Sequence, residues 1–116
     1  MQGKRLDRVN QLIKEEVSLL LQRELKDPRL GFVTVTEVET SKDLRTAKIF
    51  ISVLGDEAQW KASMTALESA RGFVRKWLRE HLDLRVTPDL DFRADHSLEH
   101  AARIQSLLKQ VQAPNS

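Results

Sequence analysis

The sequence predicts an α+β domain in which helices cover one face of a small three-stranded sheet. Two neighbouring segments are rich in β-branched residues, and a third, later segment alternates between apolar and polar residues. The segments around them repeat apolar residues at helical spacing. The predicted order is helix, strand, strand, helix, kink, helix, strand, helix. Alternation of apolar and polar residues along a strand is typical of a sheet that is covered on one side only.

The composition fits one globular domain. The chain has 116 residues, of which 41% are hydrophobic and 31% charged, so we expect a single domain over residues 1–111 and a frayed tail over 112–116. It has no cysteine, which excludes disulfides and thiolate chemistry. No apolar run is long enough to span a membrane, and the N-terminus lacks an apolar signal core. We therefore expect a cytoplasmic monomer without a membrane segment.

The first half of the chain predicts a long helix followed by a hairpin. Apolar residues recur at helical spacing from Lys4 to Lys26, and Asp27-Pro28 ends this pattern. The segments 32–39 and 46–54 read as strands, and the short polar connection between them favours an antiparallel hairpin. Val33 and Val35 share a face that Val38 does not share, which predicts a bulge near Glu37.

The second half predicts two joined helices, a strand and a final helix. Asp56 is a candidate N-cap, and Gly72 interrupts the helical pattern at a cost of about 1 kcal/mol relative to alanine, which predicts a kink. The helix continues to His81. The segment 84–94 alternates and reads as the third strand, in which Pro88 favours an edge position. A last helix is expected over 98–111, capped by Asp95 or Ser97.

Basic residues gather around the predicted kink. The net charge is only +2, so any affinity for a polyanion depends on how the charges are distributed. Between residues 71 and 85 the bases outnumber the acids, and phosphates are held by arginine side chains and by exposed backbone amides. The candidate RNA-binding residues here are Arg71, Gly72, Arg75, Lys76, Arg79 and Arg85. The start of the first helix adds Lys4, Arg5 and Arg8 as further candidates.

With these elements in place, the chain resembles the ribosome-binding factor A family from Arg5 to about Leu108. The matching stretches include Asp27-Pro28-Arg29-Leu30-Gly31, Ala47 to Gly55, Ala70 to Arg75 and Leu84 to Pro88. The resemblance implies a type II KH-like fold with an additional C-terminal helix. In this fold a helix–kink–helix with an Ala-X-Gly motif replaces the usual GXXG loop, and Ala70, Arg71 and Gly72 match that motif.

The resemblance also implies a function. Members of this family bind the small (30S) ribosomal subunit and its 16S rRNA late in maturation, and they support rRNA processing and growth in the cold. The implied partners are the rRNA and, as a further option, ribosomal proteins. Neither catalysis nor a cofactor nor a metal is implied.

Three other interpretations need to be weighed. His96, Glu99 and His100 form the H-x-x-E-H pattern of an inverted zinc protease helix, but short motifs of this kind have high false-positive rates. Trp60 and Trp77 can stack on bases, although their positions on apolar helical faces favour core packing. The main alternative function is a protein-interaction module, in which the long first helix docks to a partner and the basic face is only solubilising.

Overall fold

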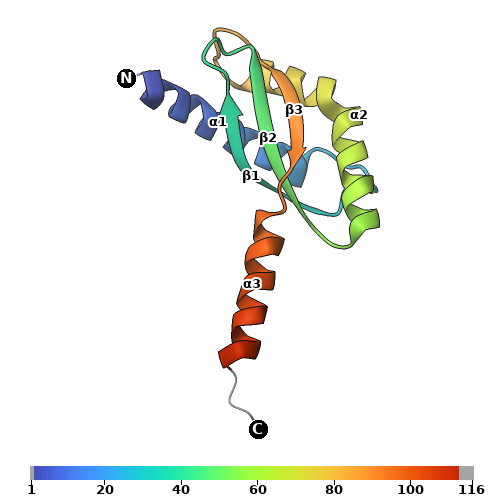
Figure 1. The fold of residues 1–116 in the computed structure, drawn as a ribbon. Helices are drawn as coiled ribbons and strands as arrows, with labels where there is room; N and C mark the ends of the chain where they lie inside the picture. Colours follow the sequence, from blue (N-terminus) through green and yellow to red (C-terminus); the bar gives the residue numbers. More distant parts are fainter. Residues whose placement is uncertain (1, 113–116) are drawn as a thin grey trace.

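The computed structural model describes residues 2–112 and confirms the α+β class with three strands and a C-terminal helix (Figure 1). Residues 113–116, which belong to the predicted tail, lie outside the described part. The elements in chain order are α1 (Gln2–Arg23), β1 (Phe32–Thr40), β2 (Thr46–Leu54), α2 (Glu57–His81), β3 (Asp89–Ala94) and α3 (Ser97–Gln112).

The sheet has the order β1-β2-β3 and is mixed. The predicted antiparallel hairpin of β1 and β2 is confirmed, whereas β3 runs parallel to β2. The register shifts between Val35 and Glu37, so the predicted bulge is present and Thr36 has no partner in the ladder. Because of this extra residue, Val35 and Val38 both turn to the core, and each is only 4% exposed.

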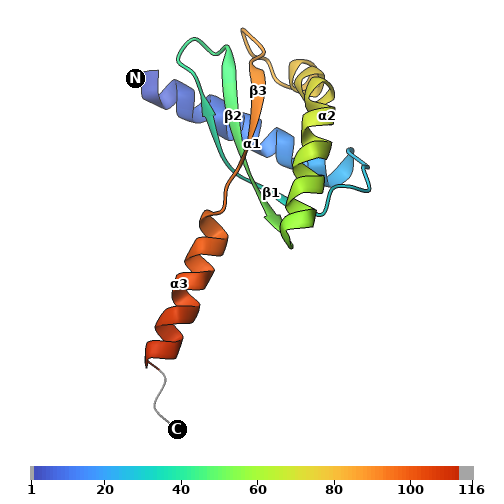
Figure 2. The ribbon, with the colours of Figure 1, turned by 45° about the vertical axis from the view of Figure 1, so that its right-hand side comes forward.

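The core lies between the sheet and the two long helices. Figures 1 and 2 show α1 and α2 behind the sheet, and the two helices also contact each other. Ile13 and Leu20 of α1, Ile49 of β2, and Leu67 and Leu78 of α2 are fully buried. Burial of each such side chain contributes about 1.5–3 kcal/mol, so these helices are fixed firmly to the sheet.

Helix α2 is continuous through the position at which the sequence predicts a joint between two helices. Its N-terminus is a capping box, as Asp56 predicts: the Asp56 carboxylate accepts a hydrogen bond from the Gln59 amide, and the Gln59 side chain accepts one from the Asp56 amide. No break is present at Gly72. The ribbon of α2 nevertheless changes direction part-way along, where its colour turns yellow (Figures 1 and 2). The kink is thus a bend within one helix.

Strand β3 is shorter than the sequence predicts. It begins at Asp89, and not near Leu84, because Pro88 has no amide proton to donate to a ladder. The Asp89 amide makes the first link to the hairpin by donating to the Arg45 carbonyl at 2.8 Å. Val86, which belongs to the segment predicted as a strand, lies instead in the loop 82–88 and is 41% exposed. β3 is an edge strand, as Pro88 favours.

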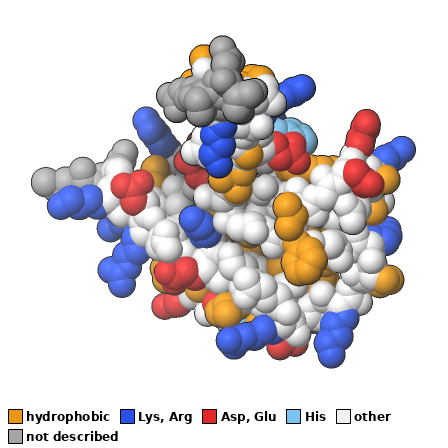
Figure 3. All heavy atoms as spheres, turned by 90° about the horizontal axis from the view of Figure 1, so that it is seen from below, with side chains coloured by type: hydrophobic (Ala, Val, Ile, Leu, Met, Phe, Trp, Pro, Cys, Tyr) orange, Lys and Arg blue, Asp and Glu red, His pale blue; other side chains and the backbone are white. Residues whose placement is uncertain are grey.

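Helix α3 does not join the other helices on the sheet. It projects away from the domain, so the expectation that all helices stack on one face is wrong for this helix (Figure 1). Its apolar side is open, with Leu98 58% and Leu107 55% exposed. Seen from the side of α3, the molecule also shows exposed hydrophobic side chains in the middle of the face and lysines and arginines around the periphery (Figure 3).

Candidate nucleic-acid interface

Most of the predicted RNA-binding cations on α2 have acidic neighbours. A guanidinium nitrogen of Arg71 lies 3.1 Å from a carboxylate oxygen of Glu68, and the Lys76 ammonium nitrogen lies 3.9 Å from a carboxylate oxygen of Glu80. Arg79 is exposed and has no acidic partner within ion-pairing distance among the described residues. Exposed ion pairs of this kind contribute at most about 1 kcal/mol, so a phosphate can compete for Arg71 and Lys76.

Arg75 has a different environment from the other basic residues of α2. One of its terminal nitrogens donates a hydrogen bond to the Thr87 carbonyl at 3.0 Å. Its Nε atom is buried without a hydrogen-bond partner among the described residues and lies 3.3 Å from an Asp89 carboxylate oxygen. These contacts tie α2 to the loop 82–88 and to the start of β3. Arg75 therefore positions a neighbouring segment, in addition to any role in binding.

Gly72 is exposed in open space on α2. Beyond its chain neighbours and its own helix backbone, a Cβ atom added there would meet no atom within 4 Å, and the backbone is not in the left-handed region. Ala70, two residues earlier, is half-buried against the core, and Arg71 is exposed. Neither close packing nor a left-handed backbone therefore requires glycine at this position.

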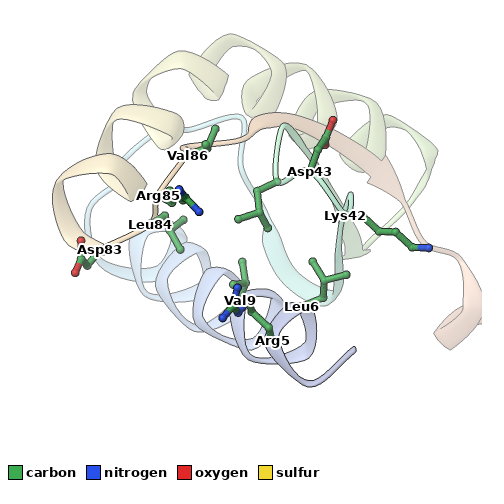
Figure 4. A pocket seen from close by; sticks show the side chains of 10 residues that line it. Arg5, Leu6, Val9, Lys42, Asp43, Asp83, Leu84, Arg85 and Val86 are labelled. Carbon is green, nitrogen blue, oxygen red and sulfur yellow. The ribbon is translucent and has the colours of Figure 1, made fainter. Parts of the chain in front are cut away.

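A second basic group surrounds a pocket of about 560 Å³ (Figure 4). The pocket lies between the start of α1, the turn between β1 and β2, and the loop 82–88. It brings together Arg5 and Arg85, two predicted RNA-binding residues that are distant in sequence. The apolar lining residues are Leu6, Val9, Leu44, Leu84 and Val86, and the charged ones are Arg5, Lys42, Asp43, Asp83 and Arg85. Lys4 and Arg8 are exposed on the same helix but do not line the pocket.

The charges around this pocket leave its mouth positive. Among residues 2–112, neither Arg5 nor Lys42 nor Arg85 lies within 4 Å of an acidic group. Asp43 belongs to the turn itself: its carboxylate accepts hydrogen bonds from the Ser41 hydroxyl and the Arg45 amide, which hold its pKa below the ordinary value. In Figure 4 Asp43 and Asp83 point away from the central space, and Arg85 points toward it.

The sequence pointed to Arg5 and Arg85 but not to the other residues that line the same pocket. Lys42 lies in a predicted turn, where the sequence alone does not separate a phosphate contact from ordinary surface charge, and Leu44 carried no signal of a site. The pocket exists only because three distant segments converge, and no local periodicity reports such a convergence.

The H-x-x-E-H segment has a structural use at the start of α3. His96 lies 3.2 Å from Glu99, and Glu99 accepts a hydrogen bond from the Trp60 indole at 2.7 Å. The hydrogen bond with His96 has the larger effect and the one from Trp60 the smaller, and both lower the pKa of Glu99. Within the described part of the chain, no three His, Cys, Asp or Glu side chains are grouped to hold a metal.

The two tryptophans pack as their helical positions predict. Trp60 belongs to the core and is 8% exposed. Trp77 is half-buried against the core, donates to Glu16 at 2.8 Å, and stacks on His81 with ring centroids 3.8 Å apart. Their indole N–H groups already donate hydrogen bonds to glutamates of α3 and α1.

In residues 2–112, no helix is both long and apolar enough to cross a membrane.

Comparison with known proteins identifies the family. The sequence profile described as ribosome-binding factor A matches residues 5–108. The chain belongs to the ribosome-binding factor A family. Ribosome-binding factor A of Halothermothrix orenii is 50% identical over 111 residues, covering 96% of this chain and 91% of that protein. That of Thermomicrobium roseum is 46% identical over 112 residues, covering 97% and 87%.

Solved structures of ribosome-binding factor A share the fold. The crystal structure of the Thermus thermophilus protein aligns with a TM-score of 0.69 and 25% identity, over 77% of this chain and 94% of that one. A homology model of Thermus thermophilus ribosome-binding factor A, fitted into a cryo-EM map of a 30S complex, aligns with a TM-score of 0.64 and 25% identity, over 75% of this chain and 91% of that one. The KH-like fold that the resemblance implied is thus confirmed.

Proposed function

We propose that this protein is an assembly factor that binds the small ribosomal subunit and contacts its 16S rRNA late in maturation. In this role it supports rRNA processing and growth in the cold. The observation that carries the proposal is the family match over residues 5–108, because a homology model of a related protein has been fitted into the map of a 30S complex. The proposed role requires neither catalysis nor a cofactor, and a single copy of the chain is sufficient.

The geometry supports RNA contact at the bend of α2. Arg71, Lys76 and Arg79 are exposed there, and their charges can position an rRNA backbone without reading its sequence. The open space at Gly72 allows a phosphate or ribose to approach the helix backbone closely. Lys4 and Arg8 offer further phosphate contacts on α1.

The test is co-sedimentation of the purified protein with immature and mature small subunits. We expect binding, and we expect the double variant Arg71→Glu, Arg79→Glu to lose most of it, because both residues are exposed and their reversal repels phosphates. Arg75 is left unchanged, since it holds the loop 82–88. The matched control is Lys26→Glu, Lys61→Glu, which reverses two exposed lysines elsewhere. Equal binding of both double variants would contradict the assignment of this surface.

The alternative function, a protein-interaction module, now depends on a different helix. The apolar side of α1 is buried in the core, so α1 does not dock to a partner through that side. The open apolar side of α3, with Ile104 45% and Leu108 51% exposed, is the observation that favours this alternative. Crosslinking on ribosomal particles distinguishes the two, because this alternative predicts adducts with protein and none with rRNA.

A further inference from the structure

We propose that the pocket between the start of α1, the turn from β1 to β2 and the loop 82–88 holds one unstacked base of single-stranded RNA. The inference rests on the proposed function and deepens it, since it names the form of RNA that is bound at one place. The site is separate from the bend of α2, which offers exposed cations and no pocket lining.

The floor of the pocket has the chemistry that a base requires. Leu6, Val9 and Leu84 point toward the central space in Figure 4 and supply an apolar surface. A volume of about 560 Å³ lies within the range of small-molecule sites and accommodates a nucleobase together with part of its ribose. A paired base in a duplex covers its faces by stacking, so only an unpaired base can use such a floor.

The charges at the mouth suit the phosphates on either side of that base. Arg85 points toward the space from the loop 82–88, and Arg5 lies at its edge on α1 (Figure 4). Neither has an acidic partner within 4 Å among the described residues, so neither must break an ion pair to bind. A guanidinium plane also stacks on a base, which allows Arg85 to cover the bound base from above.

Backbone strain marks the same place. Leu44 has a φ of 63°, a left-handed conformation that is unfavourable for a leucine. Hydrogen bonds of the turn hold it there, including those from the Leu44 amide to the Ser41 carbonyl and from the Ser41 amide to the Thr46 carbonyl. The result is a leucine side chain in the pocket lining, where an ordinary turn residue would be polar. Strain of this kind concentrates at binding sites.

The test fills the pocket without changing its charges. Val86→Trp places a large side chain on the lining, and Leu19→Trp is the control, because Val86 and Leu19 are 41% and 40% exposed. Leu19 lies on the outer surface of α1 and does not line this pocket. We expect Val86→Trp to bind small ribosomal subunits about tenfold more weakly, the effect of losing one stacked base, and Leu19→Trp to bind like the parent.

A second measurement uses the unmodified protein. Short-wavelength ultraviolet crosslinking on small subunits, followed by mass spectrometry of the peptide–nucleotide adducts, is expected to find a nucleotide on residues 84–86 or on residues 5–9. This result supports the inference even if Val86→Trp fails to fold, which circular dichroism would show. Adducts confined to α2 would overturn it.

The outcomes also separate this inference from the proposed function. If the parent protein does not bind small subunits, the proposed function fails and the inference fails with it. If the parent binds but Val86→Trp binds equally well, or if both tryptophan variants lose affinity alike, only the inference is overturned.

Discussion

At the scale of residues, Gly72 lies where neither packing nor a left-handed backbone requires glycine. Its position on the helix is exposed, and a Cβ atom there would meet nothing within 4 Å beyond its chain neighbours and its own helix backbone. Glycine destabilises such a position relative to alanine by about 0.5–1 kcal/mol. A helix with glycine at such a position is less stable than the same helix with alanine. Close approach of a partner to the helix backbone is one physical reason to have glycine there.

We therefore predict that Gly72→Ala stabilises the protein and weakens its binding. The free energy of unfolding, measured by urea denaturation, should rise by about 0.5–1 kcal/mol. Affinity for small subunits should fall, because the methyl group occupies the space beside the backbone. A variant that is more stable and binds normally would show that the glycine has no role in recognition.

Arg75 and Arg79 show why residue roles were harder to predict than positions. In the sequence both are arginines on the same helical arc, and both read as RNA contacts. The structure separates them, since Arg75 donates to the Thr87 carbonyl whereas Arg79 is exposed. The difference depends on where the loop 82–88 runs. Helical spacing carries no information about a loop that returns from later in the chain.

At the scale of elements, the junction before α3 depends on carboxylates. Asp95 accepts hydrogen bonds from the Thr36 hydroxyl at 2.6 Å and from the Ser97 amide at 2.9 Å, and these bonds lower its pKa. Glu99 is bound to His96 and Trp60, and its pKa is lowered as well. Both groups therefore favour the folded junction in their charged form.

The sign of the pH dependence follows directly. Because both pKa values are lower in the folded state, their contribution to stability is present above the ordinary carboxyl pKa and is lost as the pH falls through the lowered values. We predict that acidification releases the Trp60 indole from Glu99 before the core unfolds. Trp60 fluorescence, recorded in a Trp77→Phe background, should change at a higher pH than the far-ultraviolet circular dichroism of the core helices. The variant Glu99→Gln should lack the separate early change.

The elements differ in how well the sequence predicts them. The hairpin and its bulge were predictable because β-branched alternation and the phase change between Val35 and Val38 are local signals. The start of β3 was not, because alternation from Val86 onward continues through a loop that pairs with no strand. The position of α3 was also unpredictable, since an apolar helical face indicates burial and gives no indication of what buries it.

At the scale of the whole molecule, the basic groups at the bend of α2 and around the pocket can act together. We predict that the logarithm of the association constant for small subunits falls against the logarithm of salt concentration with a slope of roughly −3.5 to −4.5, as neutralisation of about five phosphates requires. Arg5→Gln, Arg85→Gln should make the slope less steep by about 1.4 to 1.8, and Lys26→Gln, Lys61→Gln should leave it unchanged. A slope near zero for the parent would point to protein contacts.

The molecule as a whole was more predictable than its binding surface. The fold class follows from periodicity and order, because each element must bury one face against another. The pocket requires Arg5 and Arg85 to meet across most of the chain length, and only the assembled fold brings them together. The sequence therefore offered Arg5 and Arg85 as separate candidates and gave no sign that they line one pocket.

The parallel pairing of β3 with β2 has a consequence for how the protein folds. The hairpin of β1 and β2 closes over a short turn, but β3 reaches its place only after the whole of α2 has crossed the sheet. Loop closure over a long segment is slow relative to closure of a hairpin. The hairpin and α1 should therefore form the folding nucleus, with β3 joining late. The Arg75 bridge to Thr87 would then be among the last native contacts to form.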